Sequence, residues 1–145
     1  MAITTNAIAN SFKKELLEGK HNFSNSSGSV FKLAMYTSAA TLNATTTVYT
    51  STNEVGDTGT YSAGGGILTG QTVSLDGSVA IVDFADLSFT GVTLSALGAV
   101  IYNTSFGNNA AVCVLDFGAV KTATSGTFTI LFPAFTSSAA ILRIA

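Results

Sequence analysis

The hydrophobic positions of this chain follow a helical period near the N-terminus and a period of two afterwards. Ile8, Phe12 and Leu16 recur at four-residue spacing, which predicts one amphipathic helix over residues 6–18. From Val30 onward, apolar and polar positions alternate in short runs, which is typical of half-buried β-strands. The pattern therefore predicts a mainly β protein with one short N-terminal helix.

The ends of the predicted helix carry capping signals. Thr5 or Asn6 is expected to cap the start, and Gly19 is expected to close the end in a left-handed conformation. Leu17 is expected to widen the apolar stripe. We expect this N-terminal arm and helix, residues 1–21, either to lie over one end of a sheet or to reach a neighbouring subunit.

Turn-forming residues divide the rest of the chain into short strands. The expected strands are 30–36, 45–50, 67–68, 72–75, 79–84, 87–90, 98–102, 111–117, 126–132 and 139–144. The expected turns are Asp76-Gly77, Thr90-Gly91, Gly107–Asn109 and Thr124–Gly126, of which Asp76-Gly77 is the strongest hairpin signal. Turns at this spacing indicate an antiparallel β-sandwich or barrel-like single domain over residues 1–145.

Two expected strands are apolar on both faces, 99–102 and 112–115, so each must be covered twice. The longest polar stretch, residues 51–66, is expected to form a loop that arches over the domain or into a partner. It ends in Gly64–Gly66, but no Gly-Lys-Ser/Thr follows, so a phosphate-binding loop is not indicated.

Only 10% of the 145 residues are charged while 47% are hydrophobic, and the net charge is -2. An ordinary soluble domain carries about 25% charged residues, so this surface must consist largely of hydroxyl, amide and methyl groups. Such a surface suits a protein that packs against other protein. The chain lacks the basic face that nucleic acid requires and an apolar run of membrane-spanning length, so neither partner is expected. No signal peptide is expected, which favours synthesis in the cytoplasm.

Residues with chemically useful side chains do not form a recognisable constellation. The single cysteine, Cys113, lies in an apolar run and is expected to be a small buried hydrophobe. His21 has no further ligand at metal spacing and is expected to make a helix-end or loop hydrogen bond. Asp83 and Asp86 flank Phe84-Ala85, and Asp116 precedes Phe117-Gly118; the repeated Asp-Phe unit at a strand end is interpreted as turn chemistry. No catalytic, cofactor-binding or metal-binding residue is therefore predicted.

The aromatic residues leave one binding alternative open. Tyr36, Tyr49, Tyr61 and Tyr102 are expected mainly to pack in the core or at an interface. They are also the residues that a sugar-stacking platform would use, although Trp, the usual stacking residue, is absent.

Several segments together resemble small virion structural proteins of tailed bacteriophages. The resemblance rests on residues 11–23 (SFKKELLEGKHNF), 31–38 (FKLAMYTS), 61–66, 82–86 (VDFAD) and 101–103, with Phe117-Gly118 late in the chain. It spans most of the chain and implies a non-enzymatic particle component with no active-site residues.

The resemblance and the composition together favour a capsid decoration (cement) protein. Such a protein would form a homo-oligomer, with a trimer favoured, and would bridge major capsid proteins in a virion assembled in the host cytoplasm. The N-terminal arm and helix or the 51–66 loop would make the reaching contacts. The polar, uncharged surface of residues 22–29 and 37–66, which is mostly Thr, Ser and Asn, would form the assembly face. The alternatives are a tail, neck or fibre subunit and, from another class, a carbohydrate-binding β-sandwich module.

Overall fold

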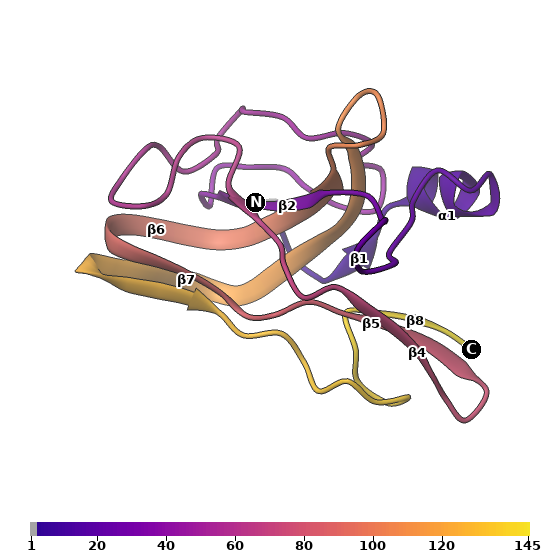
Figure 1. Cartoon of the computed structure of the whole chain (residues 1–145). Helices are drawn as coiled ribbons and strands as arrows, with labels where there is room; N and C mark the ends of the chain where they lie inside the picture. The colour runs from indigo at the N-terminus through magenta and orange to yellow at the C-terminus, as the bar shows by residue number, and fades with distance from the viewer. Residues whose placement is uncertain (1–2) are drawn as a thin grey trace.

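Two antiparallel sheets form the sandwich-like architecture of residues 3–145, the part of the chain that the computed structural model describes (Figure 1). One short helix, α1 (Asn10–Leu17), lies near the N-terminus. The mainly β, single-domain architecture expected from the alternating pattern is confirmed. The five-stranded sheet has the order β1 (Ala7–Ile8), β7 (Ala110–Ile130), β6 (Leu87–Asn103), β2 (Phe31–Tyr36) and β3 (Gly66–Ile67). The three-stranded sheet has the order β4 (Thr72–Asp76), β5 (Val79–Asp83) and β8 (Leu142–Ile144).

The two longest strands replace four of the strands expected from the sequence. β6 runs through the expected turn at Thr90-Gly91, and β7 runs through the expected turn at Thr124–Gly126. The register between them shifts at several points, between Phe89 and Val92 among others. Gly91 has φ 63° and Ser125 has φ 44°, so these residues form bulges instead of ending the strands. The two expected turns are therefore wrong, because a bulge and a turn use the same residue types.

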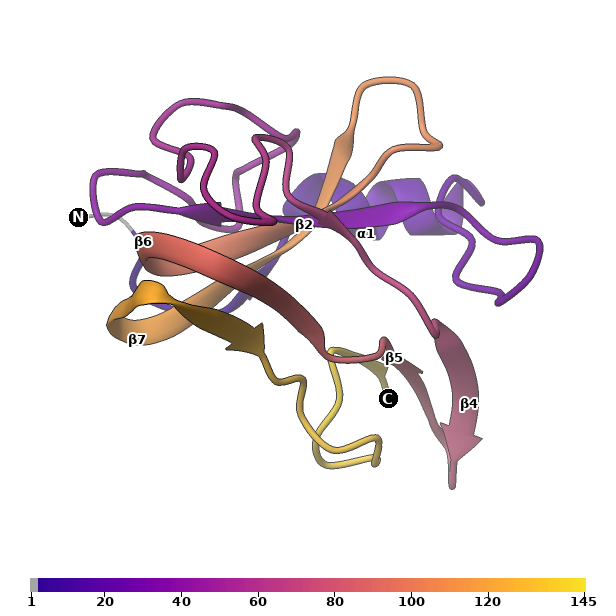
Figure 2. The same cartoon turned by 60° about the vertical axis from the view of Figure 1, so that its left-hand side comes forward.

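The core lies around the centre of the five-stranded sheet. Residues 99–102 of β6 and 111–114 of β7 are buried, as expected for strands covered on both faces. Phe31 of β2 stacks on Phe23 with ring centroids 4.4 Å apart. The connection between β2 and β3 lies above β2 and β6 in Figure 2 and buries Val55 and Tyr61 against them. The 51–66 loop therefore packs on its own domain.

The N-terminal helix is shorter than expected. Ala7 and Ile8 form β1, paired with Val114 and Cys113, so they are extended where the sequence predicted helix. The Asn6 side chain accepts the Asp116 backbone N–H at 2.7 Å instead of capping α1. The residue before the helix is Ala9, which provides no side-chain cap.

At the other end of α1, Gly19 is left-handed with φ 72°, as expected, and its N–H donates to the Leu16 carbonyl. Phe12 is buried, but Leu17 is 91% exposed and does not widen the buried stripe.

Two other expected strands differ in extent. Residues 45–50 form only an isolated bridge, between Val48 and Ala110, because the neighbouring residues follow turns. The strand expected from residue 139 begins at Leu142, after an irregular segment that starts at residue 131. The Asp76-Gly77 hairpin is confirmed: β4 and β5 pair from Thr72 and Asp83 to Asp76 and Val79.

Candidate functional site and interaction surfaces

All four tyrosines surround the carboxylate of Glu54, in the connection between β2 and β3. Glu54 Oε1 accepts the Tyr61 hydroxyl at 2.8 Å and the Gly64 N–H at 2.6 Å, and Oε2 accepts the Tyr49 hydroxyl at 2.5 Å. The Tyr102 hydroxyl donates to the Gly64 carbonyl, and the Tyr36 hydroxyl donates to the Thr50 carbonyl. These hydrogen bonds fasten the long connection to the sheet.

Burial decides what these tyrosines can do. Tyr36, Tyr61 and Tyr102 are buried, and Tyr49 stacks on Tyr102 with ring centroids 4.7 Å apart. Burial, with the nearby Glu54 charge, raises the pKa of the Tyr102 hydroxyl to about 12 and raises the pKa values of the other three as well. The expected packing role is confirmed, and the rings do not form an exposed platform on which a sugar would stack.

The glycine run at 64–66 is shaped by close packing. A Cβ on Gly65 would lie 1.8 Å from the Leu33 carbonyl oxygen, and Gly65 has φ 80°. The Gly64 N–H already points at the Glu54 carboxylate. A backbone donor that faces a carboxylate cannot cradle a phosphate, so the run serves as a close-packing segment.

His21 lies at the centre of a buried polar cluster beside α1. Its Nε2 is 2.7 Å from Glu15 Oε2, and its Nδ1 is 3.0 Å from Asn103 Nδ2. Asn103 is oriented independently, because its Oδ1 accepts the Ser105 N–H and its Nδ2 donates to the Lys20 carbonyl. The amide therefore presents its NH₂ group to Nδ1, which must accept, and the proton of the neutral ring lies on Nε2. The expected loop hydrogen bond is confirmed, and both ring nitrogens are engaged.

Two aspartates and the cysteine make contacts that stabilise the fold. Asp116 Oδ1 accepts the Gly118 N–H two residues on, which is the turn chemistry expected for Asp116. Asp86 Oδ1 instead accepts the Phe132 N–H, so it ties together two segments that are distant in the sequence. Cys113 is buried, and burial raises the pKa of its thiol to about 12. Within residues 3–145, no three His, Cys, Asp or Glu side chains gather where they would hold a metal ion. No helix in that range is long and apolar enough to cross a membrane.

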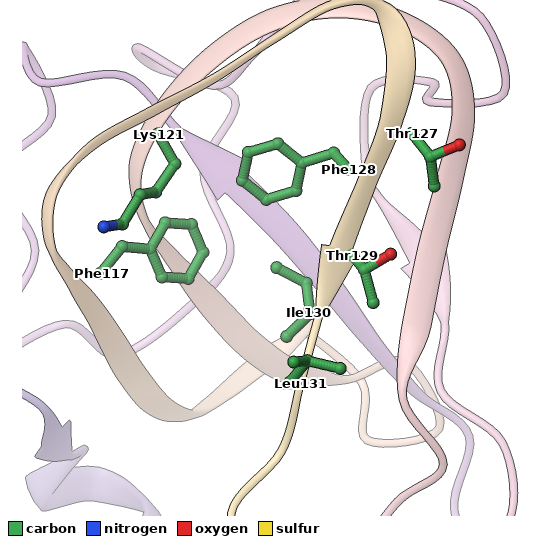
Figure 3. Close-up of a pocket in the computed structure, with 7 residues that line it drawn as sticks. All are labelled: Phe117, Lys121, Thr127, Phe128, Thr129, Ile130 and Leu131. Atoms are coloured by element: carbon green, nitrogen blue, oxygen red, sulfur yellow. The ribbon is translucent and has the colours of Figure 1, made fainter.

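A surface that was not expected from the sequence lies on residues 88–95 of β6 and residues 122–129 of β7. Phe89, Val92 and Leu94 point inward from β6, and the alternate positions point to solvent. Figure 3 shows the same division on β7, where Phe128 and Ile130 point into the hollow of the curl beside Phe117, and Thr127 and Thr129 point to the other side. The outward residues carry hydroxyl groups on both strands: Ser88, Thr90, Thr93, Ser95, Thr122, Thr124, Thr127 and Thr129. We call this set the hydroxyl face.

The hydroxyl face is ordered across the two strands. Ser88 Oγ and Thr129 Oγ1 are 2.9 Å apart, and Ser95 Oγ and Thr122 Oγ1 are also 2.9 Å apart. Along the chain from residue 87 to 130, only Asp116 and Lys121 are charged. The signal was present in the sequence as Thr and Ser at alternate positions, but it was hidden because each strand was divided at a bulge.

A second surface is an apolar groove of about 490 Å³ between α1 and the three-stranded sheet. Phe12 and Leu16 line it from the helix, and Val73, Val82 and Leu142 line it from the sheet. These three sheet residues are cross-strand partners, so they share one face. The next row along the strands, Leu75, Ala80 and Ile144, is also apolar. Val73 is 51% and Leu75 is 72% exposed, so β4 carries apolar side chains that this chain leaves uncovered.

Comparisons with protein-family models, with curated proteins and with solved structures each found no match to this chain.

Proposed function

We propose that this protein is a non-enzymatic structural component of a tailed-bacteriophage virion. Its role is that of a capsid decoration (cement) protein, which self-associates and bridges major capsid proteins on the outside of the head. The particle location comes from the resemblance of its sequence segments to small phage virion proteins. The proposed mode of binding is inferred from the hydroxyl face.

The hydroxyl face is the observation that carries the proposal. Burying a charged side chain at an interface costs several kcal/mol of desolvation unless it is well paired, whereas short hydroxyl side chains avoid most of that cost. The cross-strand hydrogen bonds Ser88–Thr129 and Ser95–Thr122 already order the face before any partner arrives. An uncharged and ordered face suits a protein that repeats many small contacts over a lattice, where multivalency raises the total affinity.

The surroundings of the chemically useful side chains support a non-enzymatic role. Both ring nitrogens of His21 are held by neighbouring side chains, and the thiol of Cys113 is buried with a raised pKa. Asp86 and Asp116 accept backbone N–H groups. Each of these groups has a structural partner that accounts for its position.

The test is binding to particles of the encoding phage that lack this protein. Wild-type protein is compared with Thr122→Lys, which places a charge on the hydroxyl face, and with Thr52→Lys, a matched change in the 51–66 loop. Both threonines are exposed, so both variants are expected to fold. We expect saturable binding of the wild type and of T52K, and at least about tenfold weaker binding of T122K, because a buried unpaired charge costs more than about 1.4 kcal/mol.

The outcomes separate the parts of the proposal. Binding that T52K abolishes and T122K leaves intact would move the contact to the 51–66 loop and overturn the role of the hydroxyl face. Binding confined to the tail or neck would overturn the decoration role and favour the tail subunit. No binding to any part of the particle would overturn the function.

A further inference from the structure

The outer edge of β4 is unprotected in a way that the other sheet edges are not. The strands that end the two sheets are β1, β3, β4 and β8. β1 and β3 have two residues each, and β8 has three residues with Arg143 at its centre. Short length and positive charge are the usual protections of a sheet edge against pairing. β4 has five residues, all exposed, and no positive charge.

The exposed part of β7 offers a contrast. Beyond its pairing with β1, the strand is curled and bulged, with Gly118 at φ 78° and Ser125 at φ 44°, and it carries Lys121. Bulges and an edge lysine both discourage a further strand. β4, in comparison, pairs with β5 in an unbroken register from Thr72 to Asp76. In Figures 1 and 2 the β4–β5 hairpin extends away from the five-stranded sheet, with β4 on its outer side.

The hairpin geometry shows which backbone groups face outward. Gly77 and Ser78 form a two-residue turn, with Gly77 at φ 64°, so Asp76 and Val79 are the hydrogen-bonded pair that closes it. Hydrogen-bonded and non-hydrogen-bonded pairs then alternate along the ladder. Ser74 therefore bonds to Ile81 of β5, and the N–H and C=O groups of Val73 and Leu75 point to the open side.

We propose that a second copy of this chain occupies this edge, with its β4 antiparallel to the first across a two-fold axis at Ser74. This pairing places Val73 opposite Leu75 of the second copy, and Leu75 opposite Val73 of the second copy. It forms about four backbone hydrogen bonds between the groups that point outward. The ends match as well, because Asp76 lies opposite Thr72 of the second copy and no two like charges face each other.

The sequence of β4 supports a second copy over an unrelated strand. Its polarity is symmetric about Ser74, in the order Thr72, Val73, Ser74, Leu75 and Asp76, so the edge is complementary to itself. A two-fold axis perpendicular to the sheet keeps both apolar faces on the same side. The apolar rows that line the α1 groove then continue across a six-stranded sheet, and the exposed side chains of Val73 and Leu75 each gain an apolar neighbour.

The size of the contact sets its strength. A five-residue edge pairing belongs to the small class of interfaces, below roughly 1,200 Å² in total, which are weak in solution. On a capsid surface the same contact is repeated and held at high effective concentration. The inference deepens the proposed function by naming the surface of self-association, but its test needs no capsid.

The test is disulfide cross-linking of Ser74→Cys. In a non-hydrogen-bonded antiparallel pair the two Cβ atoms lie about 4.5–5.5 Å apart, close enough for a disulfide after a small adjustment. The matched control is Ser78→Cys, an exposed serine in the same hairpin, whose two copies would lie roughly 20 Å or more apart, because the turn is about three residues of strand rise from the two-fold axis on each side. Cys113 is buried and does not compete.

We expect S74C to form covalent dimers at least about tenfold faster than S78C under mild oxidation, because pairing raises the effective concentration of the two thiols. Adding Leu75→Lys to S74C removes this advantage, and because Leu75 is 72% exposed this variant is expected to keep the fold, which circular dichroism checks. Equal rates for S74C and S78C, or S74C cross-linking that L75K does not slow, would overturn the inference.

Two further measurements keep this inference separate from the proposed function. Sedimentation of the wild type should show a monomer–dimer equilibrium, and a trimer would also overturn the two-fold pairing. If L75K binds capsids as well as the wild type does, and S74C fails to cross-link, then the decoration role stands and only the dimer is overturned.

Discussion

Replacing Glu54 with alanine should loosen the connection between β2 and β3. Its carboxylate accepts three hydrogen bonds, from Tyr61, Gly64 and Tyr49. Tyr61 and Gly64 are buried, so in E54A the Tyr61 hydroxyl and the Gly64 N–H are left without a hydrogen-bond acceptor. Tyr49 is half-exposed, so its hydroxyl can bond to water instead. A hydrogen bond to a charged group contributes about 1.5–3 kcal/mol, so E54A should lower the free energy of unfolding by about 3–5 kcal/mol.

Glu54→Gln provides the matched control. The amide oxygen can still accept from Tyr61 and Gly64, and the NH₂ group can donate to the Tyr49 hydroxyl after that hydroxyl turns. The loss should therefore be only about 1 kcal/mol, because the shape and two acceptor contacts remain.

Urea unfolding followed by tyrosine fluorescence measures both variants. The chain contains four Tyr and no Trp, so the signal comes from residues in contact with this network. For a chain of this size, E54A should also lower Tm by roughly 10 °C. An E54A variant that loses less than about 1 kcal/mol, or that matches E54Q, would refute the role of Glu54 as the main fastening of the connection.

Three further predictions follow from the same structure. Gly65→Ala should cost more than about 3 kcal/mol in urea unfolding, because its Cβ would meet the Leu33 carbonyl and its φ is positive, whereas Gly56→Ala, with open space around it, should cost less than about 1 kcal/mol; similar losses would contradict this packing argument. Nitrogen NMR of His21 at neutral pH should show the proton of the neutral ring on Nε2, and a proton on Nδ1 would contradict the Asn103 orientation. Cys113 should not react with a thiol reagent at pH 8 until the protein unfolds, because its raised pKa of about 12 keeps the thiol protonated; rapid reaction of the native protein would show that it is accessible.

Sequence periodicity was sufficient for the class of fold and for the local hairpins. The alternation in residues 30–36 and the Asp76-Gly77 signal both describe real elements, because each depends on neighbours within a few positions. The doubly apolar segments 99–102 and 112–115 correctly indicated strands at the centre of the core.

Long-range pairing accounts for the errors. Ile8 has helical spacing with Phe12, but pairing with Val114 and Cys113 holds Ala7 and Ile8 extended. Gly91 and Ser125 have turn propensity, but the continuous ladder of β6 and β7 incorporates them as bulges. A local window of the sequence contains neither the β1–β7 pairing nor the β6–β7 pairing, because the paired residues are far apart in the chain.

The surfaces were predicted less well than the core. The polar segment 37–66 was expected to form an assembly face, and that role stays a prediction; the sequence did not show that Glu54 and the four tyrosines fasten the segment to its own domain. The hydroxyl face needed the register of β6 against β7, which brings Ser88 beside Thr129 and Ser95 beside Thr122. Burial of polar loops and alignment of distant strands both depend on the tertiary structure.

The most direct test of the proposed function is a cryo-electron microscopy reconstruction of the phage particle that carries this protein. We predict that the protein is present in large copy number on the outside of the head, with Thr122 and Thr129 of the hydroxyl face against the major capsid protein. A particle in which the protein is absent, or in which this face is turned to solvent while another surface makes the contact, would contradict the proposal.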